Sequence, residues 1–143
     1  MKYYLAYGSN LNMGQMQQRC PDAVPITSAV ILDYRLLFRR GVATIEPKKG
    51  CSVPVGIWKI SDADEKELDR YEGFPWLYYK KTMPLRLYGG RISAMAYIMV
   101  PGYPITAPRE GYLDIIRKGY DDFGFDPGTL IEAAKHSERR KHR

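Results

Sequence analysis

Glu72 is the residue whose surroundings best suit acid–base chemistry. It stands at the expected C-terminal end of a helix and is followed by Gly73-Phe74-Pro75-Trp76. A helix dipole disfavours a negative charge at that end by about 0.3–1 kcal/mol, and the aromatic side chains that follow can exclude water from the carboxylate. Both effects raise a carboxyl pKa, which makes a Glu usable as a general base near neutral pH. The alternative is a surface Glu that simply precedes a helix-terminating glycine.

A second candidate site is the loop Tyr7-Gly8-Ser9-Asn10-Leu11, between an expected strand and an expected helix. Glycine lets the backbone turn sharply, and successive N–H groups in such a turn can bind an anion. The N-terminus of the following helix would add positive potential at the same place. The loop could therefore hold a carboxylate or a phosphate, although it lacks the Gly-x-x-x-x-Gly-Lys pattern of a phosphate loop. A plain strand-to-helix turn is the alternative.

A third candidate is the run Tyr78-Tyr79-Lys80-Lys81. Aromatic residues can stack on bases, and neighbouring basic residues can contact phosphates. Lysines that protect the edge of a sheet against further pairing are the commoner explanation.

Histidine and cysteine chemistry is poorly supported. Both histidines, His136 and His142, lie near the C-terminus, so residues 1–135 contain none. This makes a Ser-His-Asp apparatus improbable and removes the commonest zinc ligand. Cys20 and Cys51 are too far apart in sequence for a Cys-x-x-Cys motif. We therefore predict no metal and no cofactor, with acid–base groups supplied by carboxylate, Lys or Tyr.

Charge and hydropathy limit the classes of partner and the cellular location that we expect. The net charge is +6, but residues 135–143 hold five basic residues against Glu138, so the preceding part carries only +2. Nucleic-acid binding is therefore not expected, and the basic end is predicted to be solvated. No apolar run approaches the roughly 20 residues that span a bilayer, so we expect no membrane partner. The N-terminus has no signal-peptide pattern, and a cytoplasmic location is predicted.

The elements that must position these residues are mixed. We predict one domain over residues 1–134 and a basic tail over 135–143, since 143 residues suit a single domain. Strands are predicted over 2–7, 29–38, 42–46 and 53–60, a hairpin over 78–100 turning at Gly89-Gly90, and helices over 12–19, 61–72, 109–122 and 126–134. Strands and helices do not alternate strictly. We therefore predict an α+β fold with a mixed, barrel-like, largely antiparallel sheet and peripheral helices.

Four segments together resemble the γ-glutamylcyclotransferase superfamily, which includes the AIG2-like proteins. They read YLAYGSNLN, GVATIEP, LDRYEGFPWLYYKK and AYIMVPGYP. Their order and spacing agree with the family over residues 3–104. The helices after Pro108 are similar to the C-terminal part of bacterial members.

The resemblance implies a mixed barrel with a cavity at one mouth. It implies that the loop holds a glutamyl group largely through backbone atoms, with Tyr7, Gly8, Ser9, Asn10 and Leu11 as substrate-binding residues. Glu72 matches the catalytic acid/base of the family's Glu-Gly motif. A tyrosine shortly after that motif closes the site; we favour Tyr78, and a shift of one residue in strand register would substitute Tyr79. Lys80 stands where the family often has Arg, so a bidentate role is not expected there.

The implied reaction is intramolecular. The α-amine of a small-molecule γ-glutamyl amide attacks its own γ-carbonyl, which gives 5-oxoproline and a free amine or amino acid. Because nucleophile and electrophile belong to one molecule, holding them in a reactive pose lowers the barrier without a metal or a cofactor. The protein is expected to be a monomer or a homodimer. The alternative function is a non-catalytic module that binds a glutamyl group or a polyanion.

Overall fold

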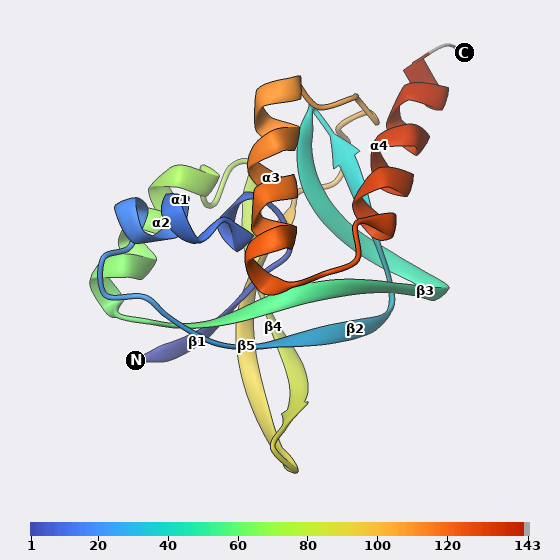
Figure 1. Cartoon of the computed structure of the whole chain (residues 1–143). Coiled ribbons are helices and arrows are strands. Elements are labelled where there is room, and N and C mark those ends of the chain that lie inside the picture. Colours follow the sequence, from blue (N-terminus) through green and yellow to red (C-terminus); the bar gives the residue numbers. More distant parts are fainter. Residues whose placement is uncertain (142–143) are drawn as a thin grey trace.

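The protein is built on a single five-stranded sheet in a computed structural model that describes residues 1–141 (Figure 1). The strands are β1 (Lys2–Ala6), β2 (Val24–Arg39), β3 (Val42–Ile60), β4 (Tyr78–Leu87) and β5 (Gly90–Met99). They lie in the order β2-β3-β1-β5-β4, and all pairs are antiparallel except β1 with β5. Lys81 Nζ of the edge strand β4 donates to Tyr34 Oη of the opposite edge strand β2 at 3.3 Å, so the sheet curls toward a barrel. The predicted α+β class and largely antiparallel sheet are confirmed.

Within residues 1–141, four α-helices and one short 3-10 turn accompany this sheet. They are η1 (Ser9–Leu11), α1 (Met13–Arg19), α2 (Asp62–Glu72), α3 (Glu110–Phe123) and α4 (Gly128–Lys141). In Figure 1, α1 and α2 lie together at one end, while α3 and α4 stand beside the long β2–β3 hairpin. No helix within residues 1–141 is long and apolar enough to cross a membrane.

Local signals define α2, the helix that carries Glu72. The Ser61 hydroxyl accepts from Asp64 N, and the Asp64 carboxylate accepts from Ser61 N, which forms a capping box. Gly73 ends the helix with a left-handed φ of 66°. Because such a φ is favourable only for residues such as glycine, the chain leaves the helix directly after Glu72.

The β2–β3 hairpin is longer and more continuous than predicted. The expected strands 42–46 and 53–60 form one strand of 19 residues, β3. The Pro47–Gly50 stretch does not break it, because β2 has an irregularity opposite: the pairing shifts between Leu32 and Tyr34. There Asp33 has a φ of 62°, and its carboxylate accepts from Gly50 N at 3.0 Å. A bulge thus absorbs the residues that looked like a loop.

Two further predictions need correction. The β4–β5 hairpin turns at Tyr88-Gly89, both with positive φ, and not at Gly89-Gly90; Gly90 already pairs with Leu87. The last helix does not end at Ala134 but continues through Lys141, with Ser137 completely buried. Residues 135–141 of the predicted basic tail are therefore helical. His142 and Arg143 lie outside the described residues.

Close packing of α3 fixes the loop that follows β1. A Cβ at Gly119 would lie 2.6–2.7 Å from backbone atoms of Leu11 and Asn12, so only a glycine lets α3 approach the loop this closely. Leu11 itself is completely buried. The loop is thus held between the central strand β1 and helix α3.

Candidate active site

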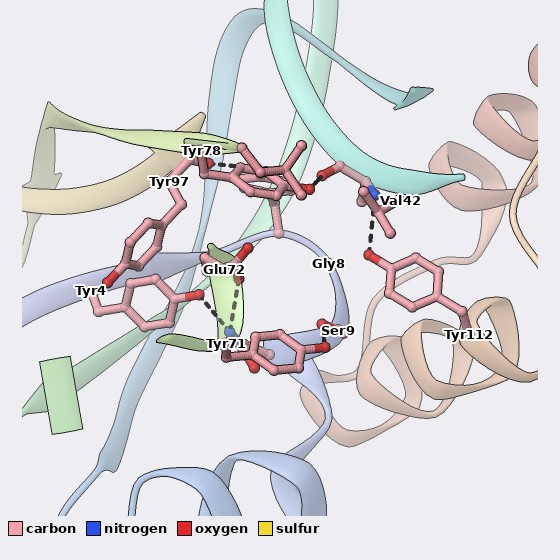
Figure 2. A pocket seen from close by; sticks show the side chains of 13 residues that line it. Tyr4, Gly8, Ser9, Val42, Tyr71, Glu72, Tyr78, Tyr97 and Tyr112 are labelled. Atoms are coloured by element: carbon pink, nitrogen blue, oxygen red, sulfur yellow. Dashed lines mark hydrogen bonds between the residues drawn. The ribbon is translucent and has the colours of Figure 1, made fainter. Parts of the chain in front are cut away.

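A cavity of about 240 Å³ opens where β1, η1, the start of β3, α2, β4, β5 and α3 meet (Figure 2). Six of the residues that line it are tyrosines, half of the twelve in the chain. The complete lining is Tyr4, Tyr7, Gly8, Ser9, Asn10, Val42, Ala43, Tyr71, Glu72, Leu77, Tyr78, Tyr97 and Tyr112. Their side chains come from elements that are far apart in sequence.

Glu72 supplies the carboxylate of this cavity. Figure 2 shows its side chain pointing between the rings of Tyr4, Tyr71 and Tyr78. Burial raises the carboxyl pKa from its ordinary value of 4.5 to about 7, and the positive charge of Arg19 partly opposes that rise. A carboxyl group with a pKa near 7 can both accept and return a proton at neutral pH.

Asn10 connects the glycine loop to Glu72. Its Nδ2 donates to Tyr4 Oη at 2.9 Å and, more weakly, to Glu72 Oε1 at 3.4 Å. Its Oδ1 accepts from the guanidinium of Arg19. Tyr71, next to Glu72 on α2, contacts the same loop because its hydroxyl is 2.9 Å from Ser9 Oγ. The loop and the C-terminal end of α2 are therefore joined by side-chain hydrogen bonds.

The opposite wall is held at the backbone of Ala43. Tyr78 Oη donates to Ala43 O at 2.6 Å, and Tyr112 Oη accepts from Ala43 N at 3.0 Å. A Cβ at Gly8 would lie 3.1 Å from the Ala43 Cβ, whereas the Gly8 φ is −129°. Gly8 therefore serves a close approach to Ala43 and not the positive φ that a sharp glycine turn suggested.

The buried tyrosine hydroxyls remain neutral over the physiological pH range. Burial raises the pKa of Tyr4, Tyr7 and Tyr78 well above the ordinary value of 10, and that of the Tyr112 hydroxyl is also raised. These hydroxyls act as hydrogen-bond donors and acceptors. Glu72 is thus the group of the cavity that changes charge near pH 7.

The structure brings together most of the residues singled out in the sequence. Tyr7, Gly8, Ser9, Asn10, Glu72 and Tyr78 all line the cavity. The last residue of the loop, Leu11, is buried in the core and does not line the cavity. Tyr79 also lies outside the cavity, with 40% of its surface exposed. Lys80 Nζ pairs with Glu65 and Asp69, at 2.8 and 2.9 Å, away from the cavity lining.

Four lining tyrosines were not anticipated as site residues: Tyr4, Tyr71, Tyr97 and Tyr112. The sequence offered signals for them: Tyr71 and Tyr112 stand on the apolar faces of their predicted helices, and Tyr4 and Tyr97 lie in the segments that resemble the family. No group of three or more His, Cys, Asp or Glu within the described part of the chain could hold a metal ion. The site is therefore a tyrosine-lined pocket around one carboxylate with a raised pKa.

The fold and the site define a class of small α+β proteins, in which a mixed, curled sheet carries a carboxylate-containing pocket at the end of its central strand. The chain belongs to the γ-glutamyl cyclotransferase, AIG2-like family, whose sequence model matches residues 4–120. It is 28% identical over 134 residues to the γ-glutamylcyclotransferases of Bos taurus and Homo sapiens, covering 85% of this chain and 71% of each relative. A solved γ-glutamyl cyclotransferase superposes with a TM-score of 0.80 and 25% identity, covering 98% of this chain and 86% of that one.

Proposed function

We propose that this protein is a γ-glutamylcyclotransferase that converts a small-molecule γ-glutamyl amide into 5-oxoproline and a free amine or amino acid. The observation that carries the proposal is Glu72, whose pKa of about 7 places a proton-exchanging carboxyl group inside a pocket beside the Gly8–Asn10 loop. Membership of the γ-glutamyl cyclotransferase, AIG2-like family supports this choice of reaction.

Glu72 would act first as base and then as acid. The α-amine nitrogen of the substrate attacks its own γ-carbonyl carbon, and a new C–N bond closes a five-membered ring. Glu72 accepts the proton that the amine loses. The bond between the γ-carbon and the amide nitrogen then breaks, and Glu72 returns the proton to the leaving nitrogen. Atoms and charges balance without a cofactor, and such acid–base catalysis is worth about 10²–10⁴-fold in rate.

The pocket would supply the substrate's pose. In η1 the first helical hydrogen bond runs from Leu11 N to Gly8 O, so the preceding N–H groups of the loop are not used within the turn. We assign these N–H groups to the α-carboxylate of the glutamyl moiety. The hydroxyls of Tyr78 and Tyr112 are already engaged by Ala43, so they shape the wall of the pocket and need not bind substrate. Holding amine and carbonyl together in this way lowers the barrier to ring closure.

The test is release of 5-oxoproline from a panel of γ-glutamyl dipeptides and γ-glutamyl-ε-lysine. We expect the wild-type protein to form product from at least one of them. Glu72→Gln should reduce turnover by about 10²–10⁴-fold, because Gln keeps the shape but cannot exchange the proton. Glu67→Gln is the matched control, since Glu67 lies on the same helix and pairs with Arg70 at the surface.

Two results would contradict the proposal. Folded wild-type protein that releases no 5-oxoproline from any substrate would leave the binding of a glutamyl group as the function of the pocket. Undiminished turnover in folded Glu72→Gln would show that another group exchanges the proton.

A further inference from the structure

Arg19 lies behind the pocket and contacts it through a neighbour. It is in the last turn of α1, and it does not line the cavity. Its guanidinium donates from Nη1 to Asn10 Oδ1 and from Nη2 to Gln15 Oε1, the second at 3.0 Å. The same group stacks on Tyr71, 3.4 Å from the centre of the ring. Arg19 is therefore fixed on two sides while its donor points at Asn10.

This contact decides which way the Asn10 carboxamide faces. A guanidinium can donate hydrogen bonds but cannot accept them, so the Asn10 oxygen must be the atom that faces Arg19. The NH2 group is then turned to the other side, toward Tyr4 Oη and Glu72 Oε1. With the opposite orientation, an NH2 group would face the guanidinium, and two oxygens, those of Asn10 and Glu72, would face each other. That arrangement would favour protonated Glu72.

We propose that Arg19 is a positioning residue: it orients the Asn10 carboxamide so that its NH2 group donates to Glu72, and it thereby holds the Glu72 side chain in the pocket. The geometry stands independently of the reaction, and only the catalytic consequence rests on the proposed function. Sequence position gives no hint of this role, since Arg19 is an ordinary basic residue at a helix C-terminus, where it also suits the dipole.

The consequence is a change in the ionisation of Glu72. The ionisable groups that interact electrostatically with its carboxylate are the neutral hydroxyls of Tyr4, Tyr7, Tyr78 and Tyr112 and the cation Arg19. Tyr71 precedes Glu72 on the same helix. Arg19 is the cation that lowers the Glu72 pKa. Without Arg19, the carboxylate loses that charge and, when Asn10 rotates, its NH2 donor. Both losses raise the Glu72 pKa.

The test compares the wild-type protein, Arg19→Met, Asn10→Ala and the double variant. The Glu72 carboxyl pKa is measured in substrate-free protein by ¹³C NMR titration, so the result does not depend on which substrate the enzyme accepts. Arg19→Met should raise that pKa by about one unit. The same variant should lose the nuclear Overhauser contacts between the Asn10 NH2 protons and the Tyr4 ring. Arg117→Met, which removes a surface arginine paired with Asp114, is the matched control.

The double variant separates positioning from simple charge. When Arg19 acts through Asn10, its removal should change the Glu72 pKa at most half as much in the Asn10→Ala background as in the native one. An equal change in both backgrounds, or retained contacts between the Asn10 NH2 group and Tyr4 in Arg19→Met, would overturn the proposal. The second measurement needs only the single variant, so it stands even when Asn10→Ala does not fold.

Activity gives an independent comparison. In an active enzyme, the acid limb of the pH profile of kcat/KM should move upward in Arg19→Met by the same amount as the NMR pKa. An unmoved limb in a variant whose NMR pKa has changed would contradict Glu72 as the base and leave the positioning role intact. A structural defect alone would lower the amount of active protein without moving the limb.

Discussion

Replacing Glu72 by Gln should stabilise the protein at alkaline pH, in addition to lowering the turnover proposed above. Burial raises the Glu72 pKa from 4.5 to about 7. Between these two values the native state binds more protons than the unfolded state, so the free energy of unfolding falls as the pH rises through this window. Each pH unit corresponds to about 1.4 kcal/mol, so ionised Glu72 costs the fold up to about 3 kcal/mol above pH 7. Gln keeps an oxygen acceptor for Asn10 and carries no charge.

Urea unfolding of the wild-type protein and Glu72→Gln at pH 4.5 and pH 8.5 measures this cost. The two proteins should have nearly equal free energies of unfolding at pH 4.5, where Glu72 is protonated in the native state. At pH 8.5 the variant should be more stable by about 2–3 kcal/mol. Glu67→Gln serves as the control, because Glu67 is exposed and its loss should give no such pH-dependent gain. A stability difference that is the same at both pH values would refute the reasoning that burial controls Glu72.

Two other pairs of variants test the walls of the site. Tyr78→Phe should lower the free energy of unfolding, measured with urea, by about 1–3 kcal/mol, because it leaves the buried carbonyl of Ala43 without its donor. Tyr79 is exposed, so Tyr79→Phe should change that free energy little. Gly119→Ala should lower the free energy of unfolding by more than about 1 kcal/mol and raise KM, because its Cβ would lie 2.7 Å from the Leu11 backbone. Gly111→Ala is on the same helix, where a Cβ would have no atom within 4 Å, and it should be tolerated. Equal thermal stability of the two alanine variants would contradict a role of α3 in holding the loop.

The parts of the fold that were predictable from sequence depend on local interactions. The capping box at Ser61 and Asp64 and the glycine stop at Gly73 define both ends of α2, and therefore the position of Glu72 at a helix end. The strand before Gly8 and the turn after it were equally local. Each of these features is determined by residues a few positions apart, which is the range over which propensity and capping act.

The features that were missed depend on contacts between distant segments. The continuity of β3 is made possible by Asp33 on a different strand, which bonds Gly50 across the bulge. The helical continuation of α4 is accompanied by a contact between His136 and Arg35 of β2, where the sequence alone showed only a basic run. Tyr78, which was favoured from the sequence, lines the pocket while Tyr79 is exposed, because successive side chains of a strand point to opposite faces. The predicted monomer or homodimer stays a prediction.

The candidate site shows the same division between local and distant information. The sequence motifs pointed to the loop and to Glu72, but they did not show that Tyr4 and Tyr97 would contribute to one pocket. These residues meet because β1 and β5 pair in parallel, with Tyr3 opposite Ala94 and Tyr4 opposite Met95. A parallel pair requires a long crossover, so no short pattern in the sequence reports it.

Because β1 is the central strand of the sheet, the pocket at its end should stay folded for as long as the whole domain does. β1 pairs with β3 on one side and β5 on the other, and the loop of residues Tyr7 to Leu11 follows it directly. Backbone amides in such a strand exchange with solvent only when the domain opens globally, whereas an exposed hairpin tip such as Tyr88 can open locally. Hydrogen exchange at Leu5 and Ala6 should therefore report global unfolding. We therefore expect this loop to lose its structure only when the whole domain unfolds, and not when an edge of the sheet melts.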